Sequence, residues 1–268
     1  MILTRTITAL VMAIVLGVVL FKAETLGWVG FILLGTFWAA WEWVGFTSLK
    51  SKVARFFLAF IFSVLVYFSY LYLNDFLIFV LAPFSILMML FSVFLFQRRR
   101  GEHLVRSDGV ILLFGLVALV PFFISLMLFR EVFSPALLLL CFFVIWAVDV
   151  GAFFSGKRFG KHKLAVYVSP GKTWEGVVGG VVVAFMVSYI GLFLLKPYMT
   201  FTIWQSALLL CLIGALSVYG DLFESVLKRQ ANIKDSGALL PGHGGLLDRV
   251  DSLMIAMPVF YIFWLWVS

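Results

Sequence analysis

Apolar runs of nearly membrane-spanning length fill most of this chain and leave little room for a water-exposed domain. Nine such runs occupy residues 6–22, 28–46, 55–73, 76–96, 109–129, 134–154, 175–195, 203–226 and 252–267. A helix needs about 20 mostly apolar residues to cross a bilayer. Hydrophobic residues make up 64% of the chain and charged residues only 12%, about half the charged share of a typical soluble domain. We therefore predict an all-α polytopic membrane protein with about nine transmembrane helices.

The first apolar run has the length of a signal peptide. The residues after it, Phe21, Lys22 and Ala23, lack the small-x-small pattern of a cleavage site. We therefore expect this run to be retained as the first membrane helix.

Basic residues gather on one side of the predicted helices. With nine spans, seventeen of the twenty lysines and arginines, Arg106 among them, fall in one set of loops, and the other set holds only Lys22, Arg130 and Lys196. Loops rich in lysine and arginine face the cytoplasm. The N-terminus is therefore expected in the cytoplasm and the C-terminus on the outer, periplasmic side of the cell inner membrane. Short basic loops beside anionic lipid also predict contact with membrane lipids and no nucleic-acid partner.

The longest polar segment, residues 225–252, reads SVLKRQANIKDSGALLPGHGGLLDRVDS and contains both charge signs and four glycines. A connecting loop needs neither this charge density nor this flexible backbone, whereas a site for phosphates and a divalent metal needs both. The predicted orientation places this segment and the loop 155–174 in the cytoplasm. Residues 131–268 are therefore expected to carry the catalytic loops, and residues 1–130 to be the N-terminal membrane helices of the same integral membrane unit.

An acidic residue lies near the inner end of the eighth predicted helix, at a depth where an ionised carboxylate is costly. Asp221 shares one helical face with Glu224, Ser225 and Lys228, which follow it by three, four and seven positions. One interpretation is that Asp221 binds a metal ion. The alternative is a buried structural ion pair with Lys228 or Arg229.

Two further carboxylates, Asp248 and Asp251, share a face where the ninth predicted helix begins. Two carboxylate-bearing helix ends that meet in one cytoplasmic pocket would bind Mg²⁺, which takes few protein carboxylates and leaves its other positions to water and phosphates. Asp149, at the inner end of the sixth predicted helix, keeps two interpretations. It is either a further metal or substrate ligand or the partner of a lysine in the loop 155–174.

The glycines around His243 suit a backbone that must approach an anion closely. Gly242, Gly244 and Gly245 flank this histidine, and glycine allows both tight turns and close contact with a ligand. The alternative is an ordinary re-entrant turn before the last helix. His243 itself either donates to a phosphate, acts as an acid or is structural.

The stretch 169–176, SPGKTWEG, precedes the seventh predicted helix. Pro170 and Gly171 are expected to form a turn, Lys172 to contact phosphate, and Thr173 or Glu175 to open the helix. The alternative is helix capping with a lysine that only follows the positive-inside rule.

Trp41, Glu42 and Trp43 lie at an inner membrane interface of the predicted topology. Tryptophan is enriched at such interfaces, so we interpret the two tryptophans as belt residues. Glu42 is interpreted as an interfacial acid with a neighbouring lysine.

The polar segment as a whole resembles the signature of the bacterial phosphatidate cytidylyltransferase family, also called CDP-diacylglycerol synthases. The pattern is S-x-x-K-R-x-x-x-x-K-D-x-G-x-x-x-P-G-H-G-G-x-x-D-R-x-D, and the chain matches it at Ser225, Lys228, Arg229, Lys234, Asp235, Gly237, Pro241, Gly242, His243, Gly244, Gly245, Asp248, Arg249 and Asp251. The stretches DVGAFFSGKRFGKHK and SPGKTWEG also look like this family. The resemblance is strong in the C-terminal half, while the N-terminal half matches mainly as membrane helices with a WEW element.

The resemblance implies a Mg²⁺-dependent nucleotidyltransferase of phospholipid biosynthesis. Its substrates would be CTP and phosphatidate, and its products CDP-diacylglycerol and pyrophosphate. The implied metal ligands are Asp221 and Asp248 with Asp251 in support, and the site is compatible with a second, monovalent or divalent cation. The other implied catalytic and nucleotide-binding residues are Lys172, Ser225, Lys228, Arg229, His243, Gly244, Gly245 and Arg249.

A homodimer is compatible with the same resemblance. The alternative function is a membrane transporter with a polar site on the cytoplasmic side. Transporters tend to place polar residues near the membrane midplane, whereas the polar residues of this chain gather at one face.

Overall fold

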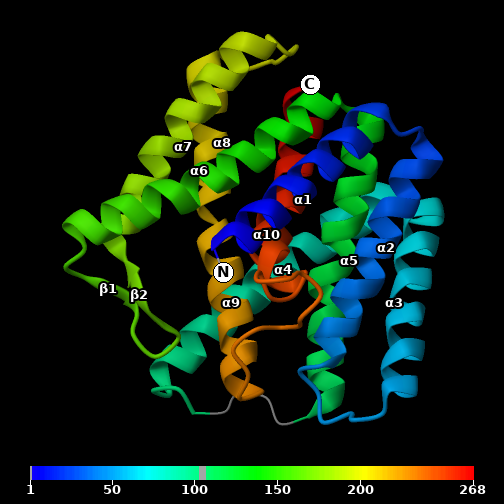
Figure 1. Cartoon of the computed structure of the whole chain (residues 1–268). Coiled ribbons are helices and arrows are strands. Elements are labelled where there is room, and N and C mark those ends of the chain that lie inside the picture. The colour runs from blue at the N-terminus through cyan, green and yellow to red at the C-terminus, as the bar shows by residue number, and fades with distance from the viewer. Residues whose placement is uncertain (1, 103–106) are drawn as a thin grey trace. The chain divides into compact units, whose positions relative to one another are not determined.

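The computed structural model describes residues 2–102 and 107–268, so Arg106 lies outside the described part. The described chain forms helices and one short hairpin (Figure 1). In chain order the elements are α1 (Ile2–Lys22), α2 (Thr25–Val44), α3 (Lys52–Tyr72), α4 (Asn74–Arg98), α5 (Asp108–Val132), α6 (Pro135–Phe159), β1 (Lys163–Ala165), β2 (Ser169–Thr173), α7 (Trp174–Leu195), α8 (Ile203–Ala215), α9 (Ser217–Gln230) and α10 (Leu247–Val267).

The predicted apolar runs all fall on helices, but the run 203–226 is divided into α8 and α9 at Leu216. The Leu216 N–H donates to the Ile213 carbonyl at 3.0 Å, and the Tyr219 N–H donates to the Leu216 carbonyl at 2.9 Å. These bonds span three residues instead of four. Such a tightened turn interrupts the α-helical ladder, and apolar periodicity alone does not reveal it.

Seven helices of the described part are long and apolar enough to cross a membrane, with α8 and α9 taken together. The apolar part of α1, Thr6–Lys22, is shorter. Helix α2 (Thr25–Val44) is not among these seven. The chain is therefore a polytopic, helical membrane protein, while the predicted count of nine spans is not confirmed.

A short antiparallel hairpin departs from the all-α prediction. Strands β1 and β2 pair Lys163 with Thr173 and Ala165 with Ser169. The turn lies at residues 166–168, so the predicted turn at Pro170 and Gly171 is wrong. A hairpin of two strands has only edge strands, and an edge strand tolerates proline.

Two compact units make up the chain. The first unit comprises Met1–Ser85, Val105–Pro135 and Leu227–Val250, and the second comprises Ile86–Leu104, Ala136–Val226 and Asp251–Ser268. Helices α4, α9 and α10 contribute residues to both units, and α6 contributes only Pro135 to the first.

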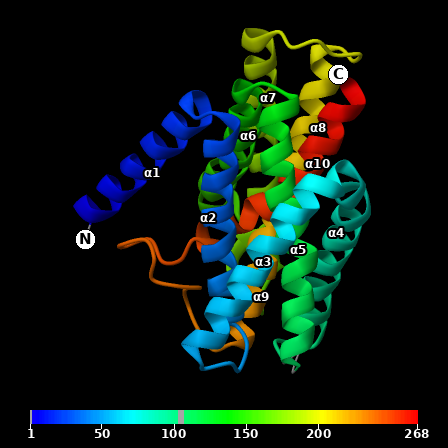
Figure 2. The same cartoon turned by 90° about the vertical axis from the view of Figure 1, so that its right-hand side faces the viewer.

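In the first unit, α2, α3 and α5 pack against one another (Figures 1 and 2). The indole N–H of Trp43 donates to the Ile111 carbonyl of α5 at 2.8 Å, and that of Trp28 donates to the Leu126 carbonyl at 3.1 Å. Trp43 is fully buried, so its prediction as a belt residue is wrong. A buried indole N–H needs an acceptor, and α5 supplies one.

In the second unit, α6 meets α7 through glycines. A Cβ atom on Gly151 would lie 2.9 Å from the Gly179 carbonyl and 2.9 Å from the Gly180 Cα. Small residues at a helix contact let two backbones approach closely in a membrane protein. The Thr173 hydroxyl accepts from the Gly176 N–H at 3.1 Å, which confirms that Thr173 opens α7.

The contact between α2 and α5 yields a stability prediction. A Cβ atom on Gly115 would lie 2.6 Å from Nε1 of Trp43, so Gly115→Ala should lower the unfolding free energy by about 1–3 kcal/mol through overpacking. Gly30→Ala in α2 is the matched control, because nothing lies within 4 Å of the added Cβ. Thermal unfolding of both variants in detergent checks the prediction, and equal midpoints would contradict it.

Candidate active site

The predicted site residues divide between the two units. The second unit contains Lys172, Asp221, Ser225 and Asp251, and the first contains Lys228, Arg229, His243, Gly244, Gly245, Asp248 and Arg249. Each group has its own set of polar contacts.

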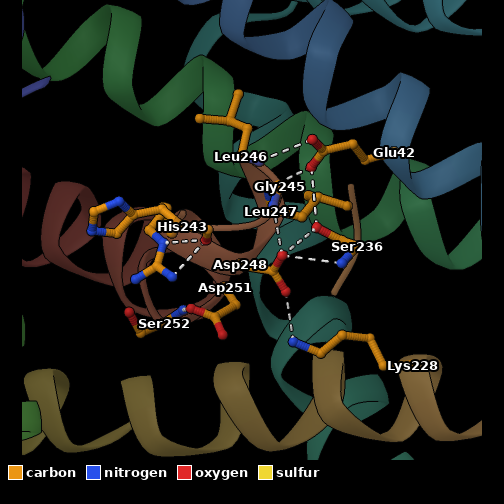
Figure 3. Close-up of polar contacts among 11 residues, drawn as sticks. Glu42, Lys228, Ser236, His243, Gly245, Leu246, Leu247, Asp248, Asp251 and Ser252 are labelled. Atoms are coloured by element: carbon orange, nitrogen blue, oxygen red, sulfur yellow. Dashed lines mark hydrogen bonds and ion pairs between the residues drawn. The ribbon is translucent and has the colours of Figure 1, made fainter. Parts of the chain in front are cut away.

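In the first unit, the Asp248 carboxylate is the centre of a hydrogen-bond network (Figure 3). Its Oδ1 accepts from the Lys228 ammonium at 2.8 Å. Its Oδ2 accepts from the Ser236 N–H and hydroxyl, both at 3.0 Å, and from the Gly245 N–H at 2.8 Å. The two charged side chains are 9% and 16% exposed for Asp248 and Lys228. The polar segment is therefore folded around this carboxylate.

A second carboxylate, Glu42 of α2, joins the same network from a distant part of the sequence. Its Oε1 accepts from the Leu246 N–H at 3.0 Å, and its Oε2 accepts from the Leu247 N–H at 2.8 Å. Figure 3 shows Glu42 reaching from α2 toward the start of α10. Glu42 is only 3% exposed and its partners are these N–H groups, so the predicted pairing with a neighbouring lysine is wrong.

These contacts complete the start of α10. The first N–H groups of a helix have no partner within the helix, and here Glu42 and Asp248 accept from the N–H groups of Leu246, Leu247 and Gly245. Negative charge also interacts favourably with a helix N-terminus. Leaving one buried donor without an acceptor costs about 1–3 kcal/mol. The two carboxylates therefore fix both the loop and the first turn of α10.

The glycines of the segment face these carboxylates. Gly242 and Gly244 have positive φ values of 76° and 83°, which favour glycine. A Cβ on Gly244 would lie 2.7 Å from Oδ2 of Asp248, and one on Gly245 would lie 2.5 Å from Oε2 of Glu42. The re-entrant turn is thus present, with its glycines packed against acids in this structure.

Arg249 stabilises the turn at residues 242–245. Its Nε and Nη2 donate to the His243 carbonyl at 3.1 and 2.7 Å, and the His243 N–H donates to the Leu240 carbonyl at 2.9 Å. Nδ1 of the His243 ring is buried without a hydrogen-bond partner among the described residues. Arg229 is exposed at the end of α9. The backbone at His243 is therefore fixed, while its ring has unused hydrogen-bonding capacity.

In the second unit, Asp221 pairs with a lysine of the hairpin. The Lys172 ammonium lies 2.5 Å from Oδ2 of Asp221 and donates to the Val218 carbonyl at 3.3 Å. The alternative in which Asp221 pairs with Lys228 or Arg229 is therefore wrong. Helical spacing favours partners on the same helix, whereas a lysine on β2 reaches Asp221 from elsewhere in the sequence.

More carboxylates surround this pair. Asp251, 8% exposed, interacts electrostatically with Asp221 and with Glu224, which is fully buried. Lys172 and Asp221 both act electrostatically on Asp149, but Lys172 pairs with Asp221, so both interpretations of Asp149 stay predictions. Ser225 is half-buried on α9. The sequence analysis placed Glu224 on the same helical face as Asp221 but did not include it among the site residues.

The fit of a metal ion rests on the chemistry of these donors. Carboxylate oxygens are the ligands that Mg²⁺ takes from proteins, and several acids interact electrostatically around Lys172 and Asp221. Within the described ranges, no group of three or more histidine, cysteine, aspartate or glutamate side chains is arranged to hold a metal ion. Lysines engage one oxygen each of Asp221 and Asp248. The donor type thus fits a divalent cation, while in this structure these oxygens are engaged by lysines.

The fold and this chemistry define a polytopic integral membrane protein whose first unit has two carboxylates, Glu42 and Asp248, packed against a glycine-rich turn. Residues 3–267 match the sequence model of the cytidylyltransferase family. The chain belongs to this family, which confirms the resemblance drawn from residues 225–251.

Several relatives share the name phosphatidate cytidylyltransferase. The relative from Haemophilus influenzae is 34% identical over 250 residues, covering 85% of this chain and 86% of its own length. The relative from Pseudomonas aeruginosa is 45% identical over 152 residues, which is 54% of either chain. The relative from Rickettsia bellii is 35% identical over 184 residues, covering 66% of this chain and 78% of its own length.

The pair of Lys172 and Asp221 yields a second prediction. Lys172→Met should lower the unfolding free energy by roughly 1–3 kcal/mol, because Asp221 then lacks its cation beside other acids. Lys163→Met, which removes an exposed lysine of the partner strand, should change it by less than about 0.5 kcal/mol. Thermal unfolding in detergent compares the two, and a neutral Lys172→Met would show that the ion pair contributes nothing to stability.

Proposed function

We propose that this chain transfers the cytidylyl group of CTP to phosphatidate, giving CDP-diacylglycerol and pyrophosphate in phospholipid biosynthesis. The observation that carries the proposal is the family match over residues 3–267, together with relatives that are named for this activity. One substrate is a membrane lipid and the other a soluble nucleotide, which agrees with a polar segment on an apolar helical protein.

The reaction joins two anions. A phosphate oxygen of phosphatidate attacks the α-phosphorus of CTP, a new P–O bond forms, and the bond to the β-phosphate breaks to release pyrophosphate. A phosphate dianion is already a competent nucleophile, so the main tasks of the protein are to neutralise charge and to align the reactants. Basic side chains beside a glycine-rich turn are suited to both tasks.

We assign the phosphate contacts to Lys172, Lys228 and Arg229. Each of the two lysines holds a carboxylate oxygen in this structure, and an ammonium that pairs with carboxylate can pair equally with a phosphate oxygen. Ser225 and His243 are proposed to hydrogen-bond with CTP or the lipid phosphate. Their support is a half-buried hydroxyl and a ring nitrogen without a partner among the described residues.

The remaining nucleotide contacts are assigned to the turn at residues 242–245. Gly244 and Gly245 are proposed to present backbone N–H groups to the nucleotide, and Arg249 to hold the turn that carries them. The positive φ of Gly244 and the two bonds from Arg249 to the His243 carbonyl support this assignment.

Magnesium is the proposed cofactor, with Asp221 and Asp248 as ligands, Asp251 in support, and room for a second cation. When bound, the ion would neutralise phosphate charge and orient the nucleotide. Lys172 and Lys228 each engage one oxygen of these carboxylates. If Mg²⁺ displaces them, the same lysines would be available to the phosphates.

The proposed setting is the bacterial cell inner membrane, with α1 and α2 completing nine spans. The N-terminus and the polar loops would face the cytoplasm, where CTP is found, and a homodimer is compatible with this arrangement. The strong bias of basic residues toward one set of loops supports the orientation. Membership of a cytidylyltransferase family leaves no observation that favours the transporter alternative.

The activity is tested on the purified chain in detergent with labelled CTP and phosphatidate. We expect pyrophosphate release that depends on phosphatidate and on Mg²⁺, and formation of a labelled lipid. Asp221→Asn and Asp248→Asn should each lower kcat by about a thousandfold, because each removes a proposed carboxylate ligand of the Mg²⁺ that would neutralise phosphate charge. Asparagine keeps the size of the side chain, so folding is preserved better than with alanine.

Glu102→Ala, at an exposed acid after α4, serves as the control and should retain wild-type turnover. Absence of phosphatidate-dependent pyrophosphate release from folded wild-type protein would refute the proposed function. Near-normal activity of folded Asp248→Asn protein would refute the metal assignment alone.

A further inference from the structure

We propose that Glu42 is a positioning residue that sets the place of the loop carrying His243, Gly244, Gly245 and Asp248. This inference rests on the proposed function, since it gives that loop a catalytic role. Glu42 belongs to α2 and lies far in sequence from the motif at residues 225–251.

Glu42 is enclosed by donors that belong to this loop. It accepts from the Leu246 N–H, the Leu247 N–H and the Ser236 hydroxyl, at 3.0, 2.8 and 3.1 Å. All these groups lie within the first unit. Because the carboxylate is 3% exposed and both of its oxygens are engaged, Glu42 acts on the reaction through the loop and not through contact with substrate.

The Ser236 hydroxyl couples Glu42 directly to Asp248. Its oxygen lies 3.1 Å from Oε2 of Glu42 and 3.0 Å from Oδ2 of Asp248 (Figure 3). A hydroxyl has one hydrogen, so it donates to only one carboxylate at a time. The Ser236 N–H remains on Asp248. When the hydroxyl donates to Glu42, Asp248 loses one of its donors without any change in the loop backbone.

The backbone around Glu42 is itself fixed. The neighbouring Trp43 donates to the Ile111 carbonyl of α5, and Nη2 of Arg55 donates to the Trp41 carbonyl at 2.9 Å. Arg55 also lies 5.0 Å from the centroid of the Trp41 ring and is the basic residue whose charge acts on Glu42. A side chain that positions a catalytic group must come from such a supported element.

The loop is shaped to receive this carboxylate. A Cβ atom on Gly237 would collide with Oε1 of Glu42, and one on Gly245 would lie 2.5 Å from Oε2 of Glu42. Two glycines of the motif are thus required by the close approach of Glu42, independently of any approach by a phosphate.

The test separates loop order from turnover in three variants. Glu42→Ala removes all three contacts, Glu42→Gln keeps the shape and one acceptor oxygen, and Ser236→Ala removes only the shared hydroxyl. Glu24→Ala, at an exposed acid before α2 that makes no cap hydrogen bond, is the matched control. Hydrogen exchange of residues 236–250 reports loop order, and steady-state kinetics with CTP and phosphatidate report catalysis.

We expect Glu42→Ala to speed exchange in this segment at least about tenfold, because buried donors lose their acceptors. Its kcat should fall about a hundredfold while KM for CTP stays within about twofold, since misplacement of a catalytic group acts on the transition state. Glu42→Gln should restore kcat to within about tenfold of wild type. Ser236→Ala should lower kcat with little change in exchange.

Two outcomes would overturn the inference. One is wild-type exchange of residues 236–250 together with wild-type kcat in folded Glu42→Ala protein, or, where that variant does not fold, wild-type kcat in Ser236→Ala protein. The other is a loss of activity that matches only the loss of folded protein, with kcat per folded molecule unchanged. If wild-type protein lacks the proposed activity altogether, the exchange data still decide whether Glu42 orders the loop, so the two failures are distinguishable.

Discussion

Burial of charge in a largely apolar chain is the constraint on which the rest of the structure depends. A carboxylate removed from water is costly unless donors or cations surround it. Asp248 accepts from Lys228, Ser236 and Gly245, Glu42 accepts from the start of α10, and Asp221 pairs with Lys172. Because each acid needs several donors, the surrounding loops have little freedom, and the polar segment takes a definite shape.

Local sequence patterns predicted much of this molecule. Runs of about 20 apolar residues identify helices because the bilayer requires that length. Of the two residues predicted to open α7, Thr173 or Glu175, Thr173 is the cap. The motif from Ser225 to Asp251 identified the family, which the match over residues 3–267 confirms. The break between α8 and α9 at Leu216 and the β1–β2 hairpin were not predicted, because neither changes the apolar pattern.

Pairings between distant residues could not be predicted in the same way. Helical spacing placed Lys228 on the face of Asp221, yet Lys172 of β2 is the partner of Asp221 and Asp248 is the partner of Lys228. Glu42 looked like an interfacial acid because its neighbours are tryptophans, and nothing near it in sequence indicates Leu246 or Leu247. The choice among several lysines and acids depends on the tertiary fold, which periodicity does not encode.

The contact between Glu42 and Leu246 spans 204 positions, and this separation matters for biosynthesis. A growing chain presents Glu42 early, but the N–H groups that accommodate its charge emerge only when the last helix is made. Until then the Glu42 carboxylate must remain hydrated or accept hydrogen bonds from other donors. The final segment of the first unit is Leu227–Val250, so this unit can fold completely only after nearly the whole polypeptide has been synthesised. A chain whose synthesis stops earlier would lack the N–H groups that donate to the Glu42 carboxylate.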